Sequence, residues 1–231
     1  MGRAWRWHGD DTAAVNPFAD RFAGPLQSDC EAIATLALAC LGISEVSPNR
    51  GPEVDRIVEL GGGQPDRAAP WCAYFVSAVL SEAVRRGIDV PHKIRTGRAV
   101  RHWTGAETAH QIDRADIWCL PPPLVCGLIF VRTRTSKSVR QRELVLAGAQ
   151  RVAGHTGITV GLSQERGILC VAGNSSGAGH SYARGSGAVA LEHYDQSGRG
   201  YARIVGFIDP IGEASAYIRD VKGLARWVLQ N

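Results

Sequence analysis

A cysteine at position 72 has the local setting of a nucleophile. It lies in the stretch PWCAYFV (70–76), at the start of a run whose apolar residues recur at helical spacing as far as Gly87. Cys72 is therefore expected in the first turn of a long helix, where unpaired N–H groups and the helix dipole lower the pKa of a thiol. A free cysteine among apolar neighbours is also a common packing residue, so the nucleophile interpretation requires a base from elsewhere in the chain.

His155 is the candidate base. It follows Gly154 in AGHTGITVG, at the expected start of a strand, and the next expected strand ends in VAGNSSG, which contains Asn174. Antiparallel neighbours bring the start of one strand beside the end of the other, so Asn174 is expected to orient the His155 ring. Two alternatives stay open: Asn174 is also typical of a turn, and His180, in the glycine-rich GAGHSYARG, is a rival base whose surroundings favour a surface histidine.

Along the sequence, the elements expected to position Cys72, His155 and Asn174 are helices first and strands afterwards. A helix is expected from Ser28 or Asp29 to Gly42, a second from Pro52 to Gly61, and a third contains Cys72. Five short segments rich in β-branched residues are the expected strands: 127–133, 155–163, 167–173, 187–194 and 201–210. This order predicts an α+β fold, with N-terminal helices packed on an antiparallel β-sheet.

The 231 residues suit one main domain with additions. We expect an irregular N-terminal arm over 1–27, the main domain over 28–210 and a helical tail over 211–231. Residues 133–154 form a long connection that ends beside His155, and they are expected to be an insertion loop. Such a loop either covers a substrate groove or is simply solvated.

The charge and hydropathy of the sequence restrict the kinds of partner that are expected. The net charge of +4 mildly favours anionic partners, but the densest basic run, 131–142, has no aromatic residues for base stacking, so nucleic acid is not expected. No apolar stretch reaches the roughly 18 residues of a membrane span, and the N-terminus lacks the apolar core of a signal peptide. Synthesis in the cytoplasm without a signal peptide, and no membrane span, are therefore expected.

The other five cysteines are expected to be packing residues with reduced thiols. The chain has no CxxC pair and no zinc-ligand spacing, and it is too long to need disulfides for stability. These cysteines are Cys30, Cys40, Cys119, Cys126 and Cys170.

Several strings, taken in order, resemble one family of enzymes. PWCAYFV, GLIFVR, GHTGITVG, VAGNSSG and RIVGFIDP are similar to motifs of the CHAP family, the cysteine, histidine-dependent amidohydrolases and peptidases related to NlpC-type and papain-like enzymes. The resemblance covers residues 28–210. It implies a papain-like fold in which Cys72 is the nucleophile, His155 the general base and Asn174 the orienting residue.

Two positions depart from the family pattern. Many members have an acidic residue where this chain has Ala172, so Asn174 is expected to orient the histidine without help from a carboxylate. Members also commonly have Gly-Asp where this chain has Gly127-Leu128, which is expected to alter a turn and not the chemistry.

The resemblance implies a peptidoglycan hydrolase that needs no metal or organic cofactor. The bond cut is either the N-acetylmuramoyl-L-alanine amide or a peptide bond of the stem or bridge. An endolysin, a wall-remodelling enzyme and an antibacterial toxin all fit, and each acts on the bacterial cell wall after release or delivery. A cysteine peptidase that acts on proteins and a catalytically inactive wall-binding module are the alternatives, and nothing in the sequence indicates the oligomeric state.

Overall fold

The computed structural model describes residues 28–91, 94–134, 138–163, 167–175 and 187–230. The arm expected over 1–27 and the rival base His180 lie outside the described residues. The described α-helices are α1 (Asp29–Leu38), α2 (Pro52–Leu60), α3 (Cys72–Arg85), α4 (Ala99–Thr104), α5 (Pro122–Val125), α6 (Ser138–Leu146), α7 (Arg199–Ala202) and α8 (Glu213–Gln230). The described strands are β1 (Gln111–Asp113), β2 (Ile129–Thr133), β3 (Gly154–Leu162), β4 (Gly167–Ser175), β5 (Ala188–Asp195) and β6 (Ile204–Ile208).

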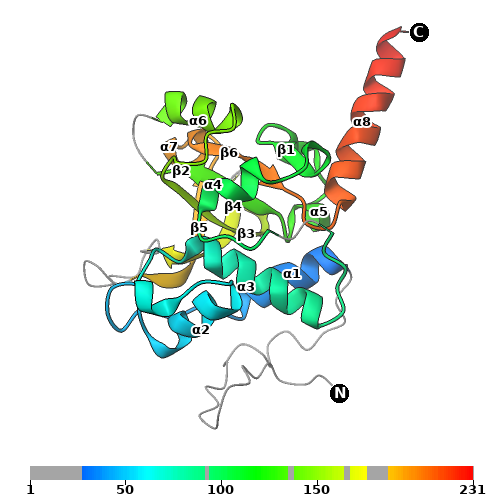
Figure 1. Ribbon diagram of the computed structural model, residues 1–231. Helices are drawn as coiled ribbons and strands as arrows, with labels where there is room; N and C mark the ends of the chain where they lie inside the picture. Colours follow the sequence, from blue (N-terminus) through cyan, green and yellow to red (C-terminus); the bar gives the residue numbers. More distant parts are fainter. Residues whose placement is uncertain (1–27, 92–93, 135–137, 164–166, 176–186, 231) are drawn as a thin grey trace.

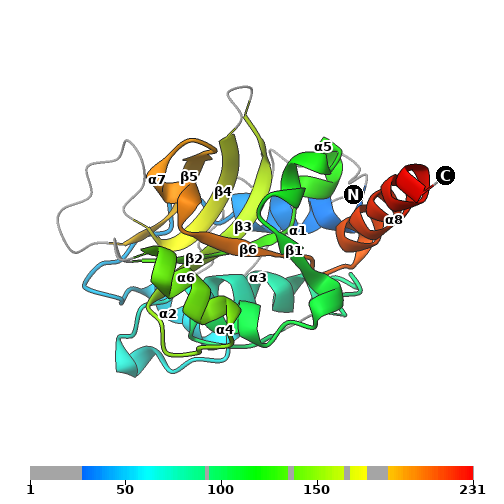
Figure 2. The ribbon, with the colours of Figure 1, turned by 90° about the horizontal axis from the view of Figure 1, so that it is seen from above.

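A six-stranded sheet forms the centre of the fold, in the order β1-β6-β2-β3-β4-β5. Neighbouring strands pair antiparallel throughout this order. Helices α1 and α3 lie side by side against β3 and β4, and α4 packs on β2 and β3 (Figures 1 and 2). The predicted α+β class with an antiparallel sheet is therefore confirmed.

The N-terminal helices begin where the sequence predicts. Ser28 caps α1, because its side-chain oxygen accepts a hydrogen bond from the backbone N–H of Glu31 at 3.2 Å. Pro52 occupies the first turn of α2, where its missing N–H leaves no hydrogen bond unmade. Helix α1 ends at Leu38, earlier than expected, and turns carry the chain on to Gly42.

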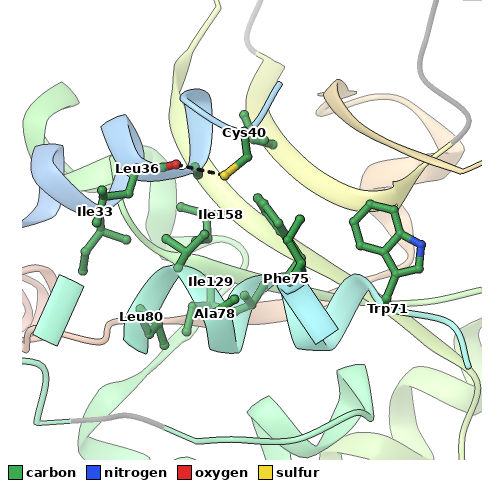
Figure 3. Packing of buried hydrophobic residues seen from close by; sticks show 14 of the residues in the cluster. Ile33, Leu36, Cys40, Trp71, Phe75, Ala78, Leu80, Ile129 and Ile158 are labelled. Carbon is green, nitrogen blue, oxygen red and sulfur yellow. Dashed lines mark hydrogen bonds between the residues drawn. The ribbon is translucent and has the colours of Figure 1, made fainter. Parts of the chain in front are cut away.

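Helix α3 begins at Cys72 and buries most of its apolar side chains. Figure 3 shows Phe75, Ala78 and Leu80 of α3 among side chains of α1 and of strands β2 and β3. The side chain of Trp71, the N-cap residue, makes no hydrogen bond to the first-turn N–H groups. The start of α3 is thus fixed by packing and not by a side-chain cap, which leaves its N–H groups available to other acceptors.

The sheet has a hydrophobic cluster on each face. Ile129 and Ile158 belong to the cluster beneath α1 and α3, whereas Phe130, Cys170 and Tyr194 belong to a second cluster. Consecutive strand residues point to opposite faces, so Ile129 and Phe130 end up in different clusters. Both faces of the central strands are consequently buried.

The structure differs from the local expectations at four points. The segment 133–154 contains α6 as well as loop, β1 was not predicted, and the start of the expected strand 201–210 lies in α7. Strand β1 is too short to show an alternating pattern, and it is held by pairing with the distant β6. Cys119, expected to pack, is exposed.

Helix α8 extends away from the rest of the described chain (Figure 1), within the segment predicted as a helical tail. Across the described ranges, none of the helices is both long enough and apolar enough to pass through a bilayer.

Gly61 allows the end of α2 to contact the first turns of α3. A Cβ atom at position 61 would lie 2.4 Å from the backbone oxygen of Tyr74 and 2.8 Å from its Cα. We expect Gly61→Ala to lower the free energy of unfolding by about 1–3 kcal/mol, because backbone must move to make room. Gly223→Ala is the control, since a Cβ at position 223 of α8 meets nothing within 4 Å. Urea unfolding followed by circular dichroism measures both, and equal stability of the two variants would contradict this account of the contact.

Candidate active site

Cys72 and His155 meet at the N-terminal end of α3. Cys72 is buried, and its sulfur hydrogen-bonds to the His155 side chain and to the backbone N–H of Thr156. Strands β3 and β4 pair from Ile158 and Val171 onward, toward Leu162. The backbone of Thr156 therefore lies beyond the paired part of the two strands, where α3 can reach it.

His155 is the second residue of β3 and is 2% exposed. Its ring meets the Phe130 ring edge-on, with 5.9 Å between centroids, which places it on the side of the second hydrophobic cluster. Its Nε2 atom lies 3.0 Å from Oε1 of Glu192. A carboxylate only accepts hydrogen bonds, so Nε2 carries a proton. Nδ1 is then the nitrogen available to Cys72.

Glu192 comes from β5 and is itself held by hydrogen bonds. The Ser175 hydroxyl donates to Oε1 at 2.5 Å, and the Tyr194 hydroxyl donates to Oε2. Burial alone would raise the pKa of this carboxyl, but the charge of His155 and the three hydrogen bonds outweigh it and lower the pKa to about 2. Glu192 is thus an ionised carboxylate next to a buried imidazole.

The electrostatics of the pair favour a thiolate and an imidazolium. Burial alone would lower the pKa of His155, but the charge of Glu192 and the hydrogen bonds to Cys72 and Glu192 raise it to about 9. Burial alone would raise the pKa of the Cys72 thiol, yet the hydrogen bond and charge of His155, the charge of Arg134 and the Thr156 N–H lower it. This is the protonation state in which a thiol is nucleophilic.

Other thiols of the chain are shifted in the opposite direction. Burial, with further contributions from nearby acidic groups, raises the pKa of Cys30 and of Cys40 to about 12. Burial also raises the pKa of Cys170 well above its ordinary value. Burial is the largest cause of the raised pKa at each of these thiols, and the partners of Cys72 account for the opposite direction there.

The side chain of Asn174 hydrogen-bonds to Asn49 and not to His155. Continuing the β3–β4 register would set the two residues opposite each other, as predicted, but β4 is irregular between Ala172 and Ser175. Asn174 has a left-handed backbone (φ 53°) and donates from Nδ2 to Oδ1 of Asn49 at 2.7 Å. The structure thus joins two of the three predicted residues, and Glu192 takes the place expected for the third.

Glu192 was not predicted from the sequence. Asn174 was expected to orient the histidine without help from a carboxylate, but a carboxylate lies against the ring. The carboxylate beside His155 comes from β5, and Ala172 of β4 is buried in the second cluster. The available signal was an acidic residue in the interior of the strand sequence AVALEHYD (188–195). A buried charge in a strand requires a partner, but that requirement does not by itself say which residue the partner is.

Two hollows flank the pair. One, of about 610 Å³, is lined by Glu45, Asn49, Pro70, Arg132, Arg134, His155, Asn174, Ser175, Gly187, Glu192 and Arg203. The other, of about 570 Å³, is lined by Pro70, Cys72, Gly97, Arg98, Ala99, Arg134, Gln150, Arg151, Val152, Ala153 and Gly154. Pro70 and Arg134 border both. The segment 150–154, at the end of the predicted insertion, therefore forms one wall beside Cys72.

Within the described part of the chain, no group of three or more histidine, cysteine, aspartate or glutamate side chains is arranged to hold a metal ion. The chain matches no family model, and neither the curated proteins nor the solved structures include a significant match to it. The resemblance to the CHAP family accordingly stays a prediction that rests on the motifs.

Replacing Glu192 by glutamine removes the charge that keeps His155 protonated and keeps a hydrogen-bonding group in its place. We expect the pH midpoint for alkylation of Cys72 by iodoacetamide to rise by about one unit or more in Glu192→Gln. Asn174→Ala should leave that midpoint unchanged. Rates are measured by mass spectrometry of the Cys72 peptide over a range of pH. A midpoint that moves with Asn174→Ala and not with Glu192→Gln would restore the original assignment.

Proposed function

We propose that this protein is a cysteine-dependent hydrolase of amide bonds, with Cys72 as nucleophile, His155 as general acid and base, and Glu192 as the positioning residue. The observation that carries the proposal is the hydrogen bond of Cys72 to a histidine that Glu192 holds at 3.0 Å. A nucleophile, a base and a third group that orients the base form the arrangement common to many acyl-transfer enzymes.

The reaction begins when the Cys72 sulfur attacks the amide carbonyl carbon. A C–S bond forms, and the carbonyl π electrons move to the oxygen, where the backbone N–H of Cys72 stabilises the developing charge. His155 then gives the proton on Nδ1 to the amide nitrogen, and the C–N bond breaks with release of the amine. The product of this half-reaction is a thioester on Cys72.

Water completes the cycle. His155, now neutral at Nδ1, removes a proton from water as the oxygen attacks the thioester carbon. The C–S bond breaks, and the electron pair returns to sulfur as the Cys72 thiolate beside the His155 imidazolium. The overall reaction consumes one amide and one water and yields an acid and an amine. No group of the protein is consumed, and no cofactor is required.

Peptidoglycan is the proposed substrate, and a papain-like fold of the CHAP type is the proposed architecture. The ordered motifs around Cys72 and His155 support both, as does a helix that presents a thiol to an antiparallel sheet bearing the base. The bond is an N-acetylmuramoyl-L-alanine amide or a peptide bond of the stem or bridge. Action on the cell wall after release or delivery follows from the same resemblance.

Digestion of purified bacterial sacculi tests this proposal. We expect the wild-type protein to release soluble fragments, and Cys72→Ala to slow their release by about 10³-fold or more, because no other group supplies the nucleophile. Cys119→Ala is the matched control, since Cys119 is exposed and lies outside both hollows. Mass analysis of the fragments identifies the bond.

Three outcomes would count against parts of this assignment. Equal release by wild type and Cys72→Ala would exclude the nucleophile. Cleavage of a protein substrate but not of sacculi would favour a peptidase that acts on proteins. Binding to sacculi with no release by any variant would favour an inactive wall-binding module.

A further inference from the structure

The hollow that contains Cys72 has an unusual charge. Arg98, Arg134 and Arg151 line it, and its lining includes no acidic residue. The neighbouring hollow also has three arginines, but Glu45 and Glu192 accompany them. The hollow beside the thiol is therefore the one in which arginines occur without any acidic side chain.

These three arginines come from separate parts of the fold. Arg98 is the N-cap residue of α4, Arg134 directly follows β2, and Arg151 precedes β3. Within the described ranges none of them forms an ion pair with a carboxylate, whereas Arg50, Arg85 and Arg86 do. Like charges that line one hollow without a counter-ion repel one another, and an anionic ligand relieves that repulsion.

Guanidinium groups match a carboxylate in shape as well as in charge. Their planar donors form paired hydrogen bonds to the two carboxylate oxygens. No aromatic side chain lines this hollow for the stacking of a nucleic-acid base. A carboxylate on a small or peptide-like substrate therefore suits the hollow better than a nucleic acid does.

We propose that this hollow binds a carboxylate of the substrate, so that the enzyme prefers amides with a free carboxylate one or two residues from the cleaved bond. This inference rests on the proposed hydrolase function and specifies its substrate class. Arg98 and Arg151 are binding residues in this account. Arg134 also lies near Nδ1 of His155 (3.5 Å), and it therefore contributes to the electrostatics of the nucleophile as well.

A matched pair of alkylating reagents tests the proposal without any hydrolysis. N-bromoacetylglycine has a carboxylate, and N-bromoacetylglycinamide is its neutral counterpart. In both, the Cys72 sulfur forms a C–S bond as the C–Br bond breaks and bromide leaves with the electron pair. The measured quantity is the ratio of the two rates at Cys72, divided by the same ratio for free cysteine.

We expect the corrected ratio to favour the carboxylate reagent by about tenfold in the wild type, as a few exposed guanidinium contacts allow. The double variant Arg98→Gln, Arg151→Gln should bring the ratio close to one. Salt at 0.5 M shortens the Debye length to about 4 Å, from about 10 Å at 0.1 M, and should reduce the ratio in the wild type. Arg101→Gln is the control, because Arg101 lies on α4 and is exposed but does not line the hollow. Circular dichroism checks that each variant is folded.

The outcomes separate this inference from the proposed function. Rapid labelling of Cys72 by the neutral reagent with no preference for the carboxylate would overturn the inference and leave the nucleophile intact. A preference that Arg101→Gln removes as fully as the double variant would also overturn it, since the effect would then come from overall charge. Labelling of Cys72 no faster than of free cysteine by either reagent would overturn the proposed function, and the inference with it.

Discussion

The contact between His155 and Glu192 is the interaction on which the rest of the site depends. It joins β3 to β5 across β4, and both side chains are largely buried. Because the pKa of His155 rises from 6.5 to about 9, its contribution to stability is complete below pH 6.5 and is lost as the pH rises through about 9. Because the pKa of Glu192 falls from 4.5 to about 2, its contribution is complete above pH 4.5 and is lost as the pH falls through about 2. Both contributions are therefore present together from about pH 4.5 to 6.5.

Several features of the sheet position His155 and Glu192 against each other. The irregularity in β4 turns Asn174 away and directs the Ser175 hydroxyl to Glu192. Gly157 has no side chain because a Cβ there would lie 2.4 Å from the backbone oxygen of Val171, which gives a physical reason for the glycine in the string GHTGI. The Cys72 thiol is on α3, in the helical layer that covers the sheet. The packing of the first hydrophobic cluster determines the position of this helix.

The sequence predicted the parts of the fold that local physics controls. Capping by Ser28, proline at position 52 and the apolar spacing after Cys72 each depend on residues a few positions apart, and those helices form where expected. Contacts between distant strands are different. The prediction for Asn174 assumed a regular register between β3 and β4. The left-handed backbone of Asn174 itself breaks that regularity. Glu192 is 37 residues from His155, and no local pattern links the two.

The protonation state of His155 decides whether the site holds a thiolate beside an imidazolium. Nitrogen-15 NMR of histidine-labelled protein, with the His155 signals assigned by their loss in His155→Asn, reports whether each ring nitrogen carries a proton. We predict that both nitrogens of His155 stay protonated at neutral pH and that the ring loses a proton near pH 9, beside an ionised Cys72. A ring that is neutral at pH 7.5 and titrates near the ordinary value of 6.5 would contradict it.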